Sequence, residues 1–427
     1  MPLESLREPL RALTLQALTS IAASESGIAG CADAIAYFDS SKDELVTASA
    51  AFPEVVQHLA GAQDIARYFG TNEAARIALQ FTFNTCNLVS KGDNPESAFD
   101  STFRAFVSEA TRDHWTYRSV ANIQNLEGPD VPLDFGNGLS IRPRSSHELA
   151  HMLGWGQHEL TRFFEDVRQV GGGSAVLMVE SESPKSPDNF LLIDDGSQHV
   201  KSARLLLAMR LAKVGEIRTG RTFAARPADF NVGMGGLTMY GFSHWHPGPH
   251  YSLTTDDIPR VSHIYDNLSA FDQQPNKTHR NLRLALRAFA SIYDRLMHQA
   301  DDRIVDAITA LEALWKLDAE LSFRLAFRTS SLLAQSDDER VSIFRTLTEY
   351  YKIRSKVVHG VGLSAQQEAK LQDDEPLRQI VRRTLRGFLK LSVSSGEWTL
   401  ARLDEDTDEK LLHSASRVSI QNAMGVL

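Results

Sequence analysis

The stretch that decides the fold of the C-terminal third is 337–360, DDERVSIFRTLTEYYKIRSKVVHG. One set of its residues recurs at spacings of three and four positions, the period of one face of an α-helix: Phe344, Leu347, Tyr351, Arg354 and Val358. We expect a helix that buries this set as a single stripe. Glycine at position 360 predicts that the helix ends there.

Arg354 is the unexpected member of that stripe, because packing alone favours a leucine at its position. Burying a guanidinium without a partner costs several kcal/mol, so we expect an acidic partner or a ligand. Glu312, at the edge of the apolar stripe of an earlier helix, is a candidate partner. Arg324 is a similar anomaly, since it falls within an apolar arc formed by residues 321–327. His359 follows Arg354 by five residues, at a helix end where the regular geometry can relax.

The C-terminal segment around this stretch, residues 276–427, reads as helical almost without interruption. Short polar turns join its candidate helices, and such short loops favour antiparallel packing of neighbours in a bundle. The candidate helices are Lys277–Gln299, Asp302–Leu317, Ala319–Ala334, Asp337–Ile353 and Ser364–Leu391.

The front two-thirds of the chain has a different pattern of apolar and polar residues. Residues 1–110 carry apolar residues at helical spacing, which predicts a helical accessory region. Residues 111–270 mix short alternating or apolar runs with helical stretches, which predicts an α+β domain that binds a partner or senses a trigger. The polar run Asp272–Asn276 is the expected linker. The expected fold class is therefore multidomain: a mixed α and α+β N-terminal portion followed by an all-α helical bundle.

Three blocks of the C-terminal segment resemble, in order and spacing, the signature blocks of Apea-like HEPN domains: Ile304–Trp315, Glu320–Arg328 and Tyr350–Gly360. The resemblance covers about residues 276–400. It implies a HEPN helical bundle that forms a homodimer, in which RxxxxH motifs of two subunits face each other and cut RNA without a metal. On this likeness Arg354 and His359 are the catalytic pair. The supporting positions are Glu312, Arg324, Tyr351, Ser355 and Lys356.

The chemistry of RNA cleavage suits those residue types. Attack by the 2′-OH needs a proton acceptor, a proton donor for the leaving 5′-oxygen, and positive charge near the phosphate. Two histidines and two arginines across a two-fold axis supply all three. The resemblance thus implies an endoribonuclease that serves as a toxin or anti-phage defence effector. The alternative is a catalytically inactive HEPN module for binding or dimerisation, because many HEPN domains have lost activity.

A rival signal lies in the front part. The segment His147-Glu-Leu-Ala-His151 matches the HExxH pattern of zinc peptidases, which places two imidazoles on one helical face. A zinc peptidase is therefore a third hypothesis. The third histidine of the extended pattern comes one residue too late, because Gln157 stands where that ligand belongs. Glu180 or Glu182 stays open as a different third ligand.

A capping box explains the same segment without a metal. Ser145 and Glu148 have the spacing that starts a helix, and the two histidines four residues apart then arise by chance. We expect no metal at His147 and His151, and no cofactor elsewhere in the chain.

Charge and composition set further limits. The formal net charge of -9 argues against a protein that coats nucleic acid by bulk electrostatics. Cys31 and Cys86 are too few for a disulfide framework and are expected as buried thiols. No signal peptide or membrane span is apparent, so we expect a cytoplasmic protein without a membrane partner. Two local basic clusters are interpreted as solvated helix faces: Arg280, Arg283 and Arg287, and Arg382, Arg383, Arg386 and Lys390.

Overall fold

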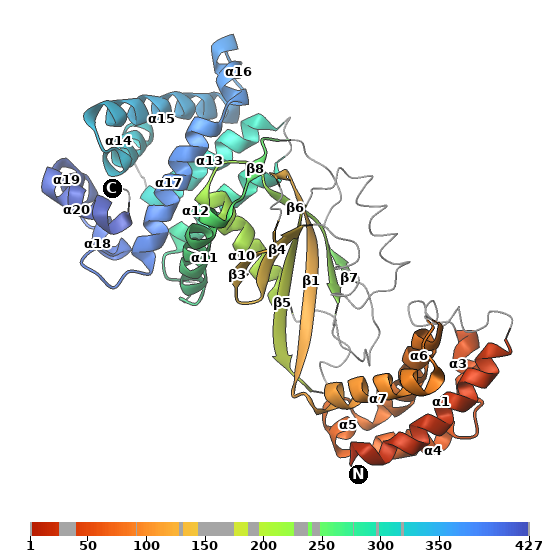
Figure 1. Cartoon of the computed structure of the whole chain (residues 1–427). Coiled ribbons are helices and arrows are strands. Elements are labelled where there is room, and N and C mark those ends of the chain that lie inside the picture. Colours follow the sequence, from red (N-terminus) through yellow and green to blue (C-terminus); the bar gives the residue numbers. More distant parts are fainter. Residues whose placement is uncertain are drawn as a thin grey trace.

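The computed structural model combines an N-terminal group of helices, a mainly antiparallel sheet and a C-terminal helical region (Figure 1). This arrangement agrees with the expected mixed α and α+β front part followed by helices. The described residues are 2–24, 40–90, 92–127, 131–143, 175–186, 196–225, 238–240, 248–275, 277–295, 299–316 and 320–425.

The N-terminal helices pack around an aromatic core. The ring of Phe81 on α6 lies 5.6 Å from that of Phe99 and 5.8 Å from that of Phe106, both on α7, in edge-to-face geometry. This core extends to Trp115 at the start of the first strand. The helices are α1 (Arg7–Ala22), α3 (Ser40–Thr47), α4 (Phe52–Gly61), α5 (Gln63–Tyr68), α6 (Ala74–Ser90) and α7 (Pro95–Thr111). The helical character expected for residues 1–110 is confirmed over the described part.

The sheet has the strand order β3-β4-β5-β1-β6-β7, and its described pairings are antiparallel. Alternate residues of its central strands, such as Ala121 and Leu177, belong to the same hydrophobic cluster as Leu205 of α10 (Ser197–Ala212). One sheet face therefore packs on this helix. The strands are β1 (His114–Gln124), β3 (Leu133–Gly136), β4 (Leu139–Pro143), β5 (Ala175–Pro184), β6 (Arg218–Ala225) and β7 (Thr238–Tyr240); a separate parallel pair joins β2 (Leu126–Glu127) to β8 (Tyr251–Ser252).

The C-terminal region is helical, as expected, but one candidate helix is wrong. The segment 364–391 is two helices, because the chain leaves helical geometry at Asp373 and Pro376 restarts it in the first turn of α17. The candidate span Asp337–Ile353 is too short, because α15 continues to Val358, close to the helix end that Gly360 predicts. The helices are α11 (Ile258–Asp272), α12 (Arg280–Asp294), α13 (Ala300–Trp315), α14 (Leu321–Leu333), α15 (Asp337–Val358), α16 (Ala365–Gln372), α17 (Glu375–Ser392), α18 (Leu400–Asp404), α19 (Thr407–Leu412) and α20 (Ser414–Met424).

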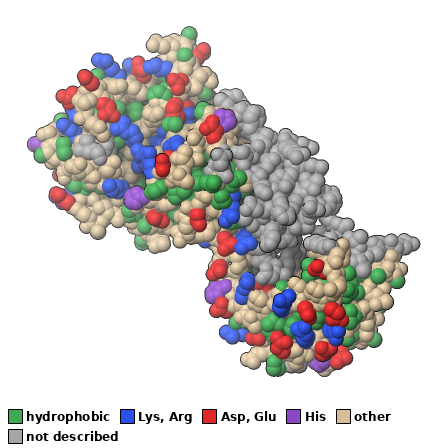
Figure 2. Space-filling view, viewed as in Figure 1, with side chains coloured by type: hydrophobic (Ala, Val, Ile, Leu, Met, Phe, Trp, Pro, Cys, Tyr) green, Lys and Arg blue, Asp and Glu red, His purple; other side chains and the backbone are tan. Residues whose placement is uncertain are grey.

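A single hydrophobic cluster runs from the sheet into the C-terminal helices, from Ala121 to Met424. The domain limits expected near residues 110 and 276 stay predictions. Cys86 is buried, as expected. Among the helices of the described ranges, none has the length and apolarity needed to cross a membrane. On the face drawn in Figure 2, basic and acidic side chains are interspersed over the helical region instead of forming one basic surface.

Candidate functional site

The buried face of α15 differs from the expected stripe. Leu347 is fully buried, but Val358 is 52% exposed, and Phe344, Tyr351 and Arg354 are only partly buried. The expected stripe is therefore wrong as a core stripe. The packed face shares Leu347 with the expected stripe, but its other residues lie one position before Phe344, Tyr351 and Arg354. A shift of one position turns the helix by about 100°. The buried residues of α15 are Ile343, Leu347, Tyr350 and Ile353. Arg354 thus lies at the edge of the packed face.

Arg354 has the acidic partner that the sequence suggested. Its Nη2 lies 3.1 Å from Oε2 of Glu312 on α13, and the Tyr351 hydroxyl donates to the other oxygen of that carboxylate at 3.0 Å. The side chains of Arg354 and Glu312 are 24% and 21% exposed. Burial, and then the hydrogen bond to the Glu312 carboxylate, raise the pKa of Tyr351. One carboxylate therefore fixes both the guanidinium and the phenol.

His359 caps the C-terminal end of α15. Gly360 adopts φ +65°, and the Val361 amide donates to the Lys356 carbonyl at 2.8 Å, which is the long bond of a Schellman motif. The helix end expected at Gly360 is thus confirmed. The His359 side chain is exposed and makes no hydrogen bond to the described residues. Its imidazole is free to meet solvent or a ligand.

Two supporting positions on the last turn of α15 have structural contacts. The Lys356 ammonium donates to Oε1 of Gln367 at 2.9 Å, and Gln367 belongs to the capping box that starts α16. The carbonyl of Ser355 accepts the His359 amide at 3.1 Å. Both residues therefore hold the backbone around His359, and Lys356 also joins α15 to α16.

Arg324 does not join this group. Its Nη2 lies 3.7 Å from Oδ2 of Asp408 on α19, a carboxylate that Arg328 binds with two hydrogen bonds of 2.6 and 2.9 Å. The expected apolar arc around Arg324 is wrong, because Phe323 is 57% exposed and Leu321 is 38% exposed. The ion pair of Arg324 within the described residues is therefore directed at α19.

The HExxH residues His147 and His151 lie outside the described residues, so the expectation that they carry no zinc stays a prediction. Of the two alternative ligands, Glu182 is exposed and Glu180 forms an ion pair with Arg118. Within the described ranges, no group of three potential metal ligands occurs.

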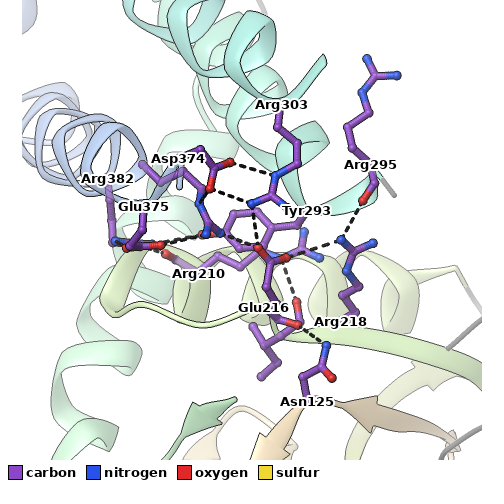
Figure 3. A network of polar contacts seen from close by, with 12 residues as sticks. Asn125, Arg210, Glu216, Arg218, Tyr293, Arg295, Arg303, Asp374, Glu375 and Arg382 are labelled. Carbon is purple, nitrogen blue, oxygen red and sulfur yellow. Dashed lines mark hydrogen bonds and ion pairs between the residues drawn. The ribbon is translucent and has the colours of Figure 1, made fainter. Parts of the chain in front are cut away.

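A buried charge network connects the sheet region to the helices, and the sequence interpretation missed it (Figure 3). At its centre the Glu216 side chain, 3% exposed, forms two ion pairs through Oε1. This oxygen lies 3.1 Å from Nη2 of Arg303 and 2.6 Å from Nη1 of Arg378. Asp374, between α16 and α17, accepts two hydrogen bonds from Arg303, at 2.8 and 2.9 Å. Although burial opposes the charge of Arg378, the carboxylates of Asp374 and Glu216 raise its pKa above the ordinary value. These four side chains are buried, and their opposite charges compensate one another.

The basic cluster on α17 belongs partly to this network. Arg382 is 4% exposed, and it donates to the Arg210 carbonyl at 2.8 Å and to the Tyr293 hydroxyl at 3.2 Å. Arg383 donates to the Leu333 carbonyl at 2.8 Å. The interpretation of this cluster as a solvated helix face is therefore wrong. A sequence signal existed, because Arg378 and Arg382 alternate with apolar residues at helical spacing just as Arg354 does.

No family model matches the chain, and no curated protein or solved structure matches it. The likeness to HEPN domains stays a prediction from the three sequence blocks.

Proposed function

We propose that this protein is a metal-independent endoribonuclease of the HEPN type. Arg354 binds the scissile phosphate and His359 transfers protons, at a site that a second copy of the chain completes. The observation that supports this most is the pairing of two features at one helix end. Arg354, held by Glu312, lies in the last turns of α15, and the C-cap that follows, His359, has an exposed imidazole without a partner among the described residues. A cellular role as a toxin or anti-phage effector follows from the resemblance.

The reaction assigns a role to each group. The 2′-oxygen attacks phosphorus as a base removes its proton, and the bond from phosphorus to the 5′-oxygen breaks as an acid protonates that oxygen. A 2′,3′-cyclic phosphate and a 5′-hydroxyl result. Arg354 stabilises the negative charge that develops on the non-bridging oxygens. The Glu312 carboxylate orients Arg354 and leaves the other side of the guanidinium to the phosphate.

Two imidazoles are needed for a simultaneous acid and base, and among the described residues the end of α15 contains one, that of His359. Val358 and Val361 flank His359 and are 52% and 53% exposed. Apolar side chains on both sides of the imidazole suit a small isologous contact around a two-fold axis, which brings two His359 residues together. The homodimer is thus part of the proposed site.

The test is RNA cleavage by purified wild-type protein in the presence of EDTA, with sedimentation to determine the oligomeric state. We expect a dimer that cleaves RNA, and an Arg354→Ala variant whose rate is lower by about 10²–10³. Arg345→Ala, an exposed arginine on the same helix, is the matched control and should retain activity. A monomeric wild type, or cleavage that persists unchanged in Arg354→Ala, contradicts the proposal.

The second candidate function is a non-catalytic binding or dimerisation module. It is favoured by the engagement of Arg354 with Glu312 and its stacking near Tyr351, 5.8 Å from the ring centroid, which also describe a structural ion pair. A wild-type dimer that leaves RNA intact under all conditions supports this alternative.

A further inference from the structure

The basic residues of α12 line a cavity that is open to solvent: Arg280 and Arg287 are exposed, as expected for a solvated helix face, and Arg283 is partly buried. The cavity has a volume of about 890 Å³ and lies between α10, α12 and the sheet strands β1 and β6. Arg280, Arg283 and Arg287 contribute to its α12 wall, and Ser119 and Thr222 contribute to its sheet wall. This volume is within the range of small-molecule sites, which measure roughly 300–1,000 Å³.

The acidic groups of the cavity already have partners. Asp272 pairs with Arg204 at 2.8 Å and with Arg283 at 3.5 Å. Asp294 lies 3.9 Å from Arg210, a buried arginine of α10. Both aspartates therefore neutralise arginine side chains that line the same cavity.

Arg280 and Arg287 remain uncompensated. Both line the cavity and are exposed, and neither has an ion pair or a side-chain hydrogen bond with the described residues. They are seven residues apart, which is about two helical turns and roughly 10 Å along one face of α12. Two free guanidiniums on one face attract an anion and suit phosphate oxygens in particular.

The α10 side of the cavity contains buried polar groups without partners among the described residues. Gln198, in the first turn of α10, is 1% exposed, and among the described residues neither its amide nitrogen nor its amide oxygen has a hydrogen-bond partner. The hydroxyl of Ser202, one turn later and 9% exposed, also lacks a partner there. Buried polar groups almost always have partners, so this donor and acceptor indicate a ligand with a complementary edge.

Apolar side chains also line the cavity. They provide a surface against which a planar ring can pack: Leu206, Leu207, Leu268, Phe271 and Leu286. A ligand that fits all three parts has an anionic group, a flat body and an edge that both donates and accepts hydrogen bonds.

We propose that this cavity binds a nucleotide, with the base edge on Gln198, the base against the leucines and the phosphates on Arg280 and Arg287. The site is separate from Arg354 and His359 and goes beyond the proposed nuclease function. Its walls combine the sheet and α10 of the front part with α12 of the C-terminal segment.

Calorimetric titration of the full chain with each of the four ribonucleoside triphosphates tests the proposal. We expect at least one to bind with Kd below about 1 mM. The double variant Arg280→Ala and Arg287→Ala should bind it at least about tenfold more weakly, because charge-assisted hydrogen bonds are lost. Arg260→Ala removes an exposed arginine of α11 outside this cavity and should bind as wild type does.

Gln198→Leu separates base recognition from simple anion binding. It keeps the side-chain size and removes a buried amide without partners, so we expect an intact fold and weaker nucleotide binding. The proposal is overturned if no triphosphate binds, if both variants bind as wild type does, or if tripolyphosphate binds as tightly as the nucleotide. Because binding is measured without RNA cleavage, this outcome is independent of the nuclease proposal.

Discussion

Two places in this molecule use arginine in opposite ways. Around Glu216, the side chains of Arg303 and Arg378 are 8% and 4% exposed, and each meets a carboxylate in the interior. Near the end of α15, the Arg354 side chain is 24% exposed and pairs with Glu312, and the exposed His359 follows five residues later in the sequence. The first place is buried and the second is partly open to solvent.

This difference shows how an unusual charge in an apolar pattern should be interpreted. The sequence anomaly at Arg354 also occurs at Arg378 and Arg382 on α17, where the charges connect parts of the fold. An anomalous arginine therefore predicts a partner, and it does not by itself predict catalysis. Solvent access together with a neighbouring group able to transfer protons, as at His359, makes the functional interpretation stronger.

The largest expected effect is on stability, from Glu216→Gln. This change removes the charge that Arg303 and Arg378 share and leaves their guanidiniums buried with less compensation. We expect the free energy of unfolding to fall by about 3–5 kcal/mol, measured by urea denaturation. A loss below about 1 kcal/mol would show that the network contributes little and would remove the contrast between the two places.

A smaller effect is expected at the open place, from Glu312→Gln. Its carboxylate accepts from Arg354 and Tyr351 but remains 21% exposed, so water compensates part of the lost charge. We expect a loss of about 1–2 kcal/mol in the same urea assay. A loss as large as that of Glu216→Gln would mean that the ion pair of Glu312 stabilises the fold as strongly as the buried network does, and it would remove the contrast between the two places.

The smallest expected effect concerns Tyr351 at alkaline pH. Burial and the hydrogen bond to Glu312 raise the pKa of Tyr351 in the folded state, so folding favours the neutral phenol. The stability that this phenol contributes is complete below its ordinary pKa of about 10 and is lost as the pH rises through the higher folded-state pKa. The unfolding free energy of wild type should therefore decline more steeply above about pH 10 than that of Tyr351→Phe. If the unfolding free energies of the two proteins decline with pH at the same slope, the ionisation of Tyr351 does not affect stability.

Local patterns predicted much of the C-terminal fold. The span of α14, Leu321–Leu333, falls within the expected 319–334, because a long periodic segment encodes its own helix. Glu312 was identified as a candidate partner of Arg354 because Arg354 occupies an apolar position of one helix and Glu312 lies at the edge of the apolar stripe of another. These results depend on spacing within single helices.

Interactions distant in sequence were not predictable in the same way. Glu216 and Arg378 are 162 positions apart, and no local period connects them. Asp374 is the N-cap of α17, and its carboxylate binds Arg303 and Arg378. The stripe on α15 was misplaced by about one residue because Tyr350 and Tyr351 are both apolar enough to face a core. Which of the two tyrosines faces the core depends on where the neighbouring helices pack against α15, and the sequence of α15 alone does not contain that information.

The cleavage rate of His359→Ala with EDTA present tests the central claim most directly. We expect the rate to fall by about 10²–10⁴ relative to wild type, because a proton-transfer group is lost. The free energy of unfolding should stay within about 0.5 kcal/mol, since the side chain is exposed and makes no hydrogen bond to the described residues. His413→Ala, another exposed histidine, should cleave RNA as wild type does. If His359→Ala, folded and dimeric, cleaves RNA as fast as wild type, then α15 does not carry the active site.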